Sequence, residues 1–381
     1  MGAANGVPGA TAAFGARARP WYRRFELWLL AALVIYPFFP FLDLGVSAIF
    51  GDQLRLDRQL VNIFIFAILA LALNLQVGYA GLLQLGIAAF FAIGAFTTGL
   101  VSVEKYPFQF GFWGAIVLAP IVSGVAGLVL GAPTVRLKGD YLAIVTLGFG
   151  EVVRVVALNL DAITDGPRGL SPIASAWIPE PVAKALGDEG NQSHFVTMYF
   201  VALILLVALV VSFQLLEHSR AGRAFVALRE DELASAAMGI NPARTKLSAF
   251  AVGAAIAGLA GALYATNLKT TGEPNNYDFN TSIIVLCYII VGGLGSIRGV
   301  LLGTFVLMAF DTVVSPLLTK AIQGAVGDTD SVFLSLTNWR LMIFGLALIL
   351  MMRFRPEGLW PSARLKEELH EPGGPTAGGP T

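Results

Sequence analysis

Long uninterrupted runs of apolar residues recur along the chain. In the block 200–211 every position is apolar, so a helix built from it has no polar face to offer water. A helix that crosses a bilayer needs about 20 mostly apolar residues, and its backbone polar groups must be satisfied within the segment. Ten runs approach this length: 27–48, 60–78, 86–102, 112–132, 141–160, 195–216, 247–267, 281–296, 299–316 and 339–353. The pattern predicts an all-α fold, a polytopic membrane bundle of about ten transmembrane helices.

The order of these runs predicts two related halves. Five runs precede the polar segment 161–194, and five follow it. Because each half crosses the membrane an odd number of times, the two halves enter it from opposite sides, as inverted repeats do. We therefore expect two inverted five-helix halves.

The charges of the connecting segments predict the orientation. Lys and Arg collect on the cytoplasmic side of membrane proteins. With the N-terminus inside, the basic segments become cytoplasmic, including 217–246 and the tail after residue 353, while the acid-rich segments 161–194 and 316–338 lie outside. We expect both termini in the cytoplasm, a basic tail over 1–26, a transmembrane domain over 27–353 and a second tail over 354–381.

Composition and missing motifs narrow the function. Hydrophobic residues make up 56% of the 381 residues, charged residues only 13%, and the net charge of zero gives no reason to expect nucleic acid. The chain contains no G-x-x-x-x-G-K-[ST], G-x-S-x-G or H-E-x-x-H motif, and its one cysteine and three histidines are scattered. We therefore expect no catalytic residue, no metal ligand and no cofactor in this chain. Any energy must come from an ion gradient or from another subunit.

Charged residues inside the predicted spans are few. Glu151 and Arg154 lie three residues apart, on one face of the span 141–160. We interpret them as a structural ion pair, with a conformational hinge and a proton or substrate relay as alternatives. Asp311 falls near an outer membrane boundary, where we expect it to be interfacial.

Small residues recur at four-residue spacing in two spans. Gly253, Ala257 and Gly261 form one such series, and Gly295, Gly299 and Gly303 form another. This spacing lets helix backbones approach closely in a membrane. It predicts tight packing, with a gated, moving interface as the alternative.

The polar segment 217–246 holds the most informative pattern. Glu230, Asp231 and Glu232 precede a run of small residues that ends at Gly239 and Pro242. Carboxylates favour the first turn of a helix, and Gly followed by Pro favours its end. We predict a surface helix of about ten residues, whose narrow ridge suits another protein's groove. The alternative is a helix that only covers the end of the bundle.

Several blocks of sequence resemble one known family. Glu232, Ala236, Ala237 and Gly239 resemble the degenerate E-A-A…G coupling loop of ABC importer permeases. The block ALREDELASAAMGINPARTKLSAF resembles the LivM-type permease of branched-chain amino acid importers. Further resemblance covers 73–96, 135–156, 163–173, 290–306 and 354–360, which is nearly the whole membrane region.

The resemblance implies the ten-helix importer fold and an assembly. The expected partners are a second permease subunit, two cytoplasmic ATPases that bind ATP and Mg²⁺, and a periplasmic or lipid-anchored solute-binding protein, in a bacterial or archaeal cytoplasmic membrane. It also implies that the predicted surface helix, at 230–239, transmits ATPase closure to the bundle. The residues expected to form this contact are Arg229, Glu230, Asp231, Glu232, Ala236, Ala237 and Gly239. Substrate-binding residues are not identified.

Some positions depart from the family's usual motifs. Leu82, Gln84 and Ile87 replace its Gln, Ser and His, Asp165 replaces a Gly, and Glu273 precedes Pro274 where Ser is usual. These departures loosen the expectation of branched-chain amino acids, because relatives that carry urea or short amides share most of the motifs. An ion-coupled secondary carrier is the alternative from another class.

Overall fold

The computed structural model describes residues 56–107, 109–137, 139–174, 193–319, 339–355 and 357–360. Within these ranges every regular element is a helix, which confirms the all-α class. The first half contains α3 (Leu56–Asn74), η2 (Leu75–Tyr79), α4 (Ile87–Ser102), α5 (Gly111–Thr134), α6 (Asp140–Asn159), α7 (Asp161–Thr164) and η3 (Gly166–Arg168). The second contains α9 (Ser193–His218), α10 (Arg220–Glu230), α11 (Glu232–Ala237), α12 (Pro242–Leu268), η4 (Pro274–Tyr277), α13 (Phe279–Gly292), α14 (Ile297–Ala309), η5 (Phe310–Val314) and α16 (Arg340–Phe354).

The described part of the chain supports a polytopic membrane bundle. Six of its helices are long and apolar enough to cross a membrane: Gln59–Tyr79, Gly111–Thr134, Asp140–Asn159, Thr197–His218, Pro242–Leu268 and Ile297–Thr319. Two shorter apolar helices are α4 and α13. The predicted span 27–48 and most of both predicted tails lie outside the described residues. The count of ten and the inverted halves therefore stay predictions.

The predicted span 281–296 is wrong in its bounds, because the helix there is Phe279–Gly292. Helix α13 has 14 residues, about 21 Å at 1.5 Å per residue, whereas a bilayer core is about 30 Å thick. It ends at Gly292 because Gly293 and Gly295 take positive φ values of 123° and 74°, which a helix does not accept. The single turn η4 precedes it, so the chain reaches α13 through irregular backbone.

Small residues bring the central helices together, as their spacing predicts. A Cβ built on Gly261 of α12 would lie 2.8 Å from the backbone nitrogen of Ala95 in α4. One built on Gly299 of α14 would lie 2.5 Å from the carbonyl oxygen of Gly292 in α13. No side chain fits either gap, so these glycines set the distance between the helix axes.

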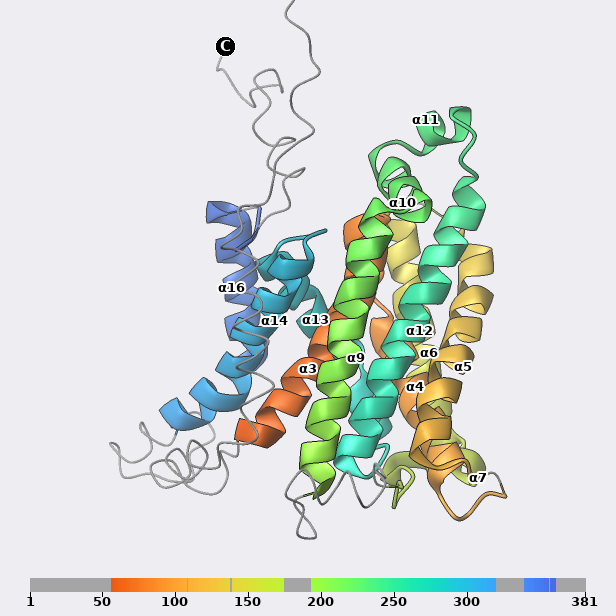
Figure 1. Cartoon of the computed structure of the whole chain (residues 1–381), viewed down its shortest axis with the longest axis vertical. Helices are drawn as coiled ribbons and strands as arrows, with labels where there is room; N and C mark the ends of the chain where they lie inside the picture. Colours follow the sequence, from red (N-terminus) through yellow and green to blue (C-terminus); the bar gives the residue numbers. More distant parts are fainter. Residues whose placement is uncertain are drawn as a thin grey trace, which may run out of the picture.

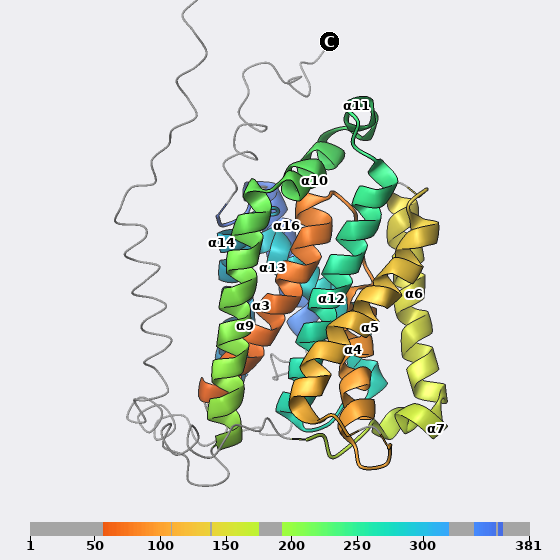
Figure 2. The same cartoon turned by 45° about the vertical axis from the view of Figure 1, so that its right-hand side comes forward.

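The helices differ in how far the bundle covers them. In the most apolar 18-residue window of Gln59–Tyr79, 78% of the residues are buried, and this helix runs through the centre (Figure 2). The corresponding share for Asp140–Asn159, which stands at one edge, is 22%. The short helices α10 and α11 lie at one end of the bundle, and α7 lies at the other (Figure 1). The bundle thus has two distinct ends, and we call α6, the least buried of the six long spans, the open helix.

Candidate functional site: the α10–α11 end

Helix α10 is held against the end of the bundle. Its N-cap is Ser219, whose side-chain oxygen accepts a hydrogen bond from the Gly222 backbone at 3.1 Å. Phe225 and Leu228 lie three residues apart, so they share one face of the helix, and both are buried. The helix therefore lies flat on the bundle with its polar face outward.

Arg229 connects α10 to the transmembrane core. Its guanidinium donates a hydrogen bond of 2.7 Å to the carbonyl of Gly78 in η2. A Cβ on Gly81 would lie 2.8 Å from the Cγ of Arg229, so the loop after η2 passes directly under this side chain. The guanidinium, predicted as a contact to a partner, thus binds its own chain.

The predicted ten-residue helix is wrong in its bounds. Glu230 is the last residue of α10, and the next helix, α11, spans only Glu232–Ala237. Asp231 separates the two because its backbone is extended, with φ of −152°. Its carboxylate accepts hydrogen bonds from the Leu233 and Ala234 backbones, at 2.7 and 3.1 Å, and so caps α11.

Gly239 ends α11 as its sequence predicts. Its φ is +86°, and the Ile240 amide donates to the Ser235 carbonyl while the Gly239 amide donates to that of Ala236. These two bonds define a Schellman motif, which favours glycine at this position. Asn241 then caps α12 by accepting from the Arg244 backbone at 3.1 Å.

Glu232 also contacts its own chain. Its carboxylate lies 2.9 Å from the ammonium of Lys246, whose side chain is only 6% exposed. The same ammonium lies 3.4 Å from the carbonyl of Val135, just after α5. One ion pair therefore joins α11 to α12 and to the end of α5.

The outward surface of α11 is apolar. Leu233 and Met238 are 76% and 83% exposed, and Ala236 and Ala237 lie between them. Leu233 and Met238 were not among the predicted contact residues, although both are large apolar residues in a segment too polar to span. Ala236 and Gly239 border a hollow of about 510 Å³ between α11 and the start of α12. We call the surface of Leu233, Ala236, Ala237 and Met238 the α11 ridge.

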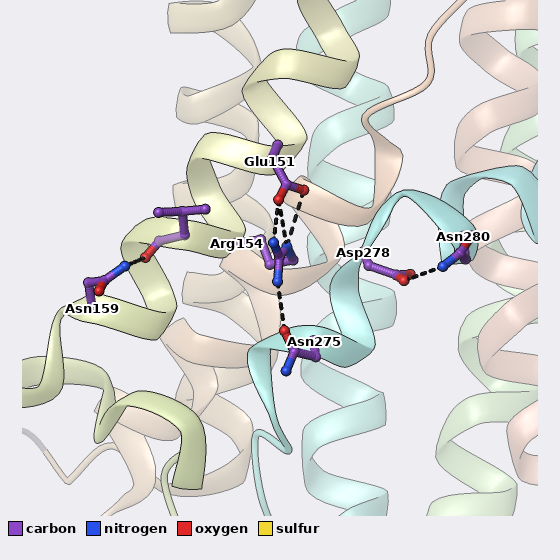
Figure 3. A network of polar contacts seen from close by, with 7 residues as sticks. Glu151, Arg154, Asn159, Asn275, Asp278 and Asn280 are labelled. Atoms are coloured by element: carbon purple, nitrogen blue, oxygen red, sulfur yellow. Dashed lines mark hydrogen bonds and ion pairs between the residues drawn. The ribbon is translucent and has the colours of Figure 1, made fainter.

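The predicted ion pair on α6 is present and reaches beyond its own helix. The Nε atom of Arg154 lies 3.0 and 3.1 Å from the two carboxylate oxygens of Glu151. Its Nη1 atom donates to the side-chain oxygen of Asn275 in η4 at 2.6 Å (Figure 3). The pair thus connects the open helix α6 to the irregular backbone before α13.

Asp311 is largely covered by its own chain, and its predicted place at an outer membrane boundary stays a prediction. It lies in the π-helical turn η5, its side chain is 13% exposed, and it forms an ion pair of 3.2 Å with Arg340 at the start of α16. Among the described residues no cluster of His, Cys, Asp and Glu could hold a metal ion.

The chain is similar to known transport permeases. The family model of the branched-chain amino acid transport system permease component matches residues 55–352. The chain is 37% identical to the high-affinity branched-chain amino acid transport system permease protein LivM of Salmonella typhimurium, over 90% of this chain and 77% of the relative. LivM of Escherichia coli is 36% identical over the same shares.

A second type of permease is also similar. The permease protein LivH of Salmonella typhimurium is 24% identical over 68% of this chain and 85% of the relative. No solved structure matches the chain.

Proposed function

The chain belongs to the family of branched-chain amino acid transport permeases, and on this premise we propose that it is one of two membrane subunits of an ATP-driven importer of leucine, isoleucine and valine. It moves solute and catalyses no bond chemistry. The relatives LivM and LivH are both described as permeases of high-affinity branched-chain amino acid transport. A LivH-like chain is therefore the partner permease that we propose.

The α11 ridge is the observation that carries the mechanism. It is apolar and exposed, it stands at the end of the bundle, and caps and an ion pair fix it to α10 and α12. An exposed apolar surface that such contacts hold in place is suited to binding a protein partner. Two cytoplasmic ATPases bind ATP and Mg²⁺ in this proposal, and α11 carries their movement into the bundle through Lys246 and Arg229.

The proposed orientation follows from the ridge. If α11 contacts cytoplasmic ATPases, α10 and α11 face the cytoplasm, and α7 faces the periplasm or cell exterior. Both termini are then cytoplasmic, in agreement with the loop charges. A periplasmic or lipid-anchored solute-binding protein delivers substrate at the α7 end.

The open helix α6 is the surface that we assign to the second permease. Its exposed residues include Ile144, Val152 and Val156, and the same helix carries Glu151 with 47% of its side chain exposed. Because a charged side chain facing lipid is costly, we propose that this side of α6 faces the translocation path between the two permeases.

Reconstitution tests the proposed function. Proteoliposomes that hold this chain, its partner permease and the ATPases should take up leucine only with ATP inside and binding protein outside. Isoleucine and valine should compete with leucine, while urea and acetamide should not. Competition by acetamide but not isoleucine would favour the amide permeases. Leucine uptake by this chain alone, under a proton or sodium gradient, would show a secondary carrier.

A further inference from the structure

A polar cavity of about 360 Å³ lies in the half of the bundle away from α10 and α11. It is bordered by Asn62 near the start of α3, Tyr264 near the end of α12, the turn η4, α13, η5 and α16. Tyr264 follows Pro242 by 22 residues, about 33 Å along α12 at 1.5 Å per residue. This volume lies within the range of small-molecule sites, about 300–1,000 Å³.

One wall of the cavity is aromatic. Phe66 packs against Phe91, Tyr264 and Tyr288, with ring centroids 6.1, 6.2 and 6.4 Å apart. Phe91 and Tyr264 are 5.2 Å apart. All four rings line the cavity, so this wall offers an apolar surface to an aliphatic group.

Most of the other residues that line the cavity are polar. Asp278 caps α13 by accepting from the Thr281 backbone at 3.0 Å, and its second oxygen accepts from the Asn280 side chain at 2.6 Å (Figure 3). Asn275 and Asn276 of η4 also line the cavity. Arg154 holds the Asn275 oxygen, so the ion pair on α6 orients one of these polar groups.

Charges of both signs border the cavity. Arg340 and Asp311 lie 3.2 Å apart, and Asp278 adds a second carboxylate. A guanidinium has five N–H donors, and the bond to Asp311 uses one of them. Asp311 also lies in a π-helical turn, a feature that occurs often at functional sites. Ionisable groups within membrane segments usually mark solute or ion pathways.

We propose that this cavity binds the transported solute as a zwitterionic α-amino acid with an aliphatic side chain. The solute carboxylate binds the guanidinium of Arg340, the ammonium binds the carboxylate of Asp278 and neighbouring amide oxygens, and the side chain packs on the aromatic wall. The site is a receiving chamber for solute released by the binding protein. This inference rests on the proposed function, because only an importer of amino acids delivers this ligand here.

The first test removes the charge of Asp278 without removing its cap. Asn is as good an N-cap as Asp, so Asp278→Asn should leave the amount of assembled importer unchanged. We expect leucine uptake to fall about tenfold, as the loss of one charge-assisted contact implies. ATP hydrolysis stimulated by loaded binding protein should continue. Asp140→Asn is the matched control, because Asp140 is exposed at the start of α6 and does not border the cavity. This variant should transport leucine normally.

The second test separates binding from a structural ion pair. In the double variant Asp311→Arg/Arg340→Asp the pair is kept with its polarity reversed. We expect the single variants to lose uptake and the double variant to regain membrane level but not uptake. Normal uptake by the double variant and by Asp278→Asn would overturn the inference. A wild-type importer that hydrolyses ATP but carries no leucine would instead contradict the proposed function.

Discussion

The two ends of the bundle place their charged groups differently. At the α11 end, Asp231 caps a helix and Glu232 binds Lys246, while the exposed α11 ridge is apolar. At the opposite end, the carboxylates of Asp278 and Asp311 border a cavity. The first arrangement suits a protein partner that covers an apolar ridge. The second suits a small charged solute.

Adding a charge to the α11 ridge should have the largest effect. Met238→Glu and Leu233→Glu each put a carboxylate where we expect an apolar contact with the ATPase. A buried anchor is worth about 2 kcal/mol or more, so affinity for the ATPase should fall about thirtyfold. Titration of the solubilised permease pair with ATPase measures this. Gln109→Glu, which adds the same charge in the exposed loop between α4 and α5, is the control, and equal affinity for all three variants would contradict the ridge assignment.

A bulky residue on the ridge should disturb docking and leave the fold intact. Ala236 is exposed beside the hollow, so Ala236→Trp meets no neighbour that must move in the free chain. When the ATPase is bound against the α11 ridge, the extra volume of Trp should cost about 1–3 kcal/mol of binding free energy. We expect normal membrane level, lost uptake, and either lost ATPase association or uncoupled hydrolysis. Wild-type uptake and association would mean that α11 only covers the bundle.

The ion pair between Glu232 and Lys246 should contribute to stability, because the ammonium of Lys246 is buried. Glu232→Ala leaves the ammonium of Lys246 buried without this carboxylate, which should lower the free energy of unfolding by about 1–3 kcal/mol. The double variant Glu232→Ala/Lys246→Met should recover most of that loss, because the long apolar side chain fills the same space. Thermal unfolding in detergent measures both. If the double variant is no more stable than the single one, the pair is not what fixes α11.

Gly239 should show the smallest effect. A Cβ at this position meets no atom within 4 Å, so Gly239→Val suffers only from its φ of +86°. Left-handed backbone costs a non-glycine residue about 1–2 kcal/mol, and asparagine tolerates it better. We expect reduced uptake for Gly239→Val and near-normal uptake for Gly239→Asn. Equal uptake by the two variants would show that the turn after α11 does not need this conformation.

Local patterns predicted more of the fold than of the site. The length of the apolar runs predicted the spans, and the spacing of Gly299 and its neighbours predicted close helix packing. Both features depend only on residues that are near one another in the sequence. The pair Glu232–Lys246 and the pair Asp311–Arg340 span 14 and 29 residues, so they depend on how helices pack. The cavity could not be predicted for the same reason, since its walls come from eight separate elements.

The predicted bounds of the helix in the segment 217–246 were wrong for a different reason. Three consecutive carboxylates predict a helix start but do not say which of them is the cap. In the structure Asp231 takes that place, and Glu230 closes the preceding helix. The exposure of Leu233 and Met238 follows from that register, because the cap decides which residues point away from the bundle.

Site-specific cross-linking tests the central claim most directly, namely that the α11 ridge seats in the ATPase on the cytoplasmic side. The experiment starts from a variant in which the buried Cys287 is changed to Ser. A single cysteine is then placed at Met238 or, as a control, at the exposed Glu104 near the end of α4. In intact importer, Met238→Cys should cross-link to the ATPase, with a yield that changes when ATP binds, and Glu104→Cys should not. Labelling of Met238→Cys from outside intact cells, without any cross-link to the ATPase, would contradict the account.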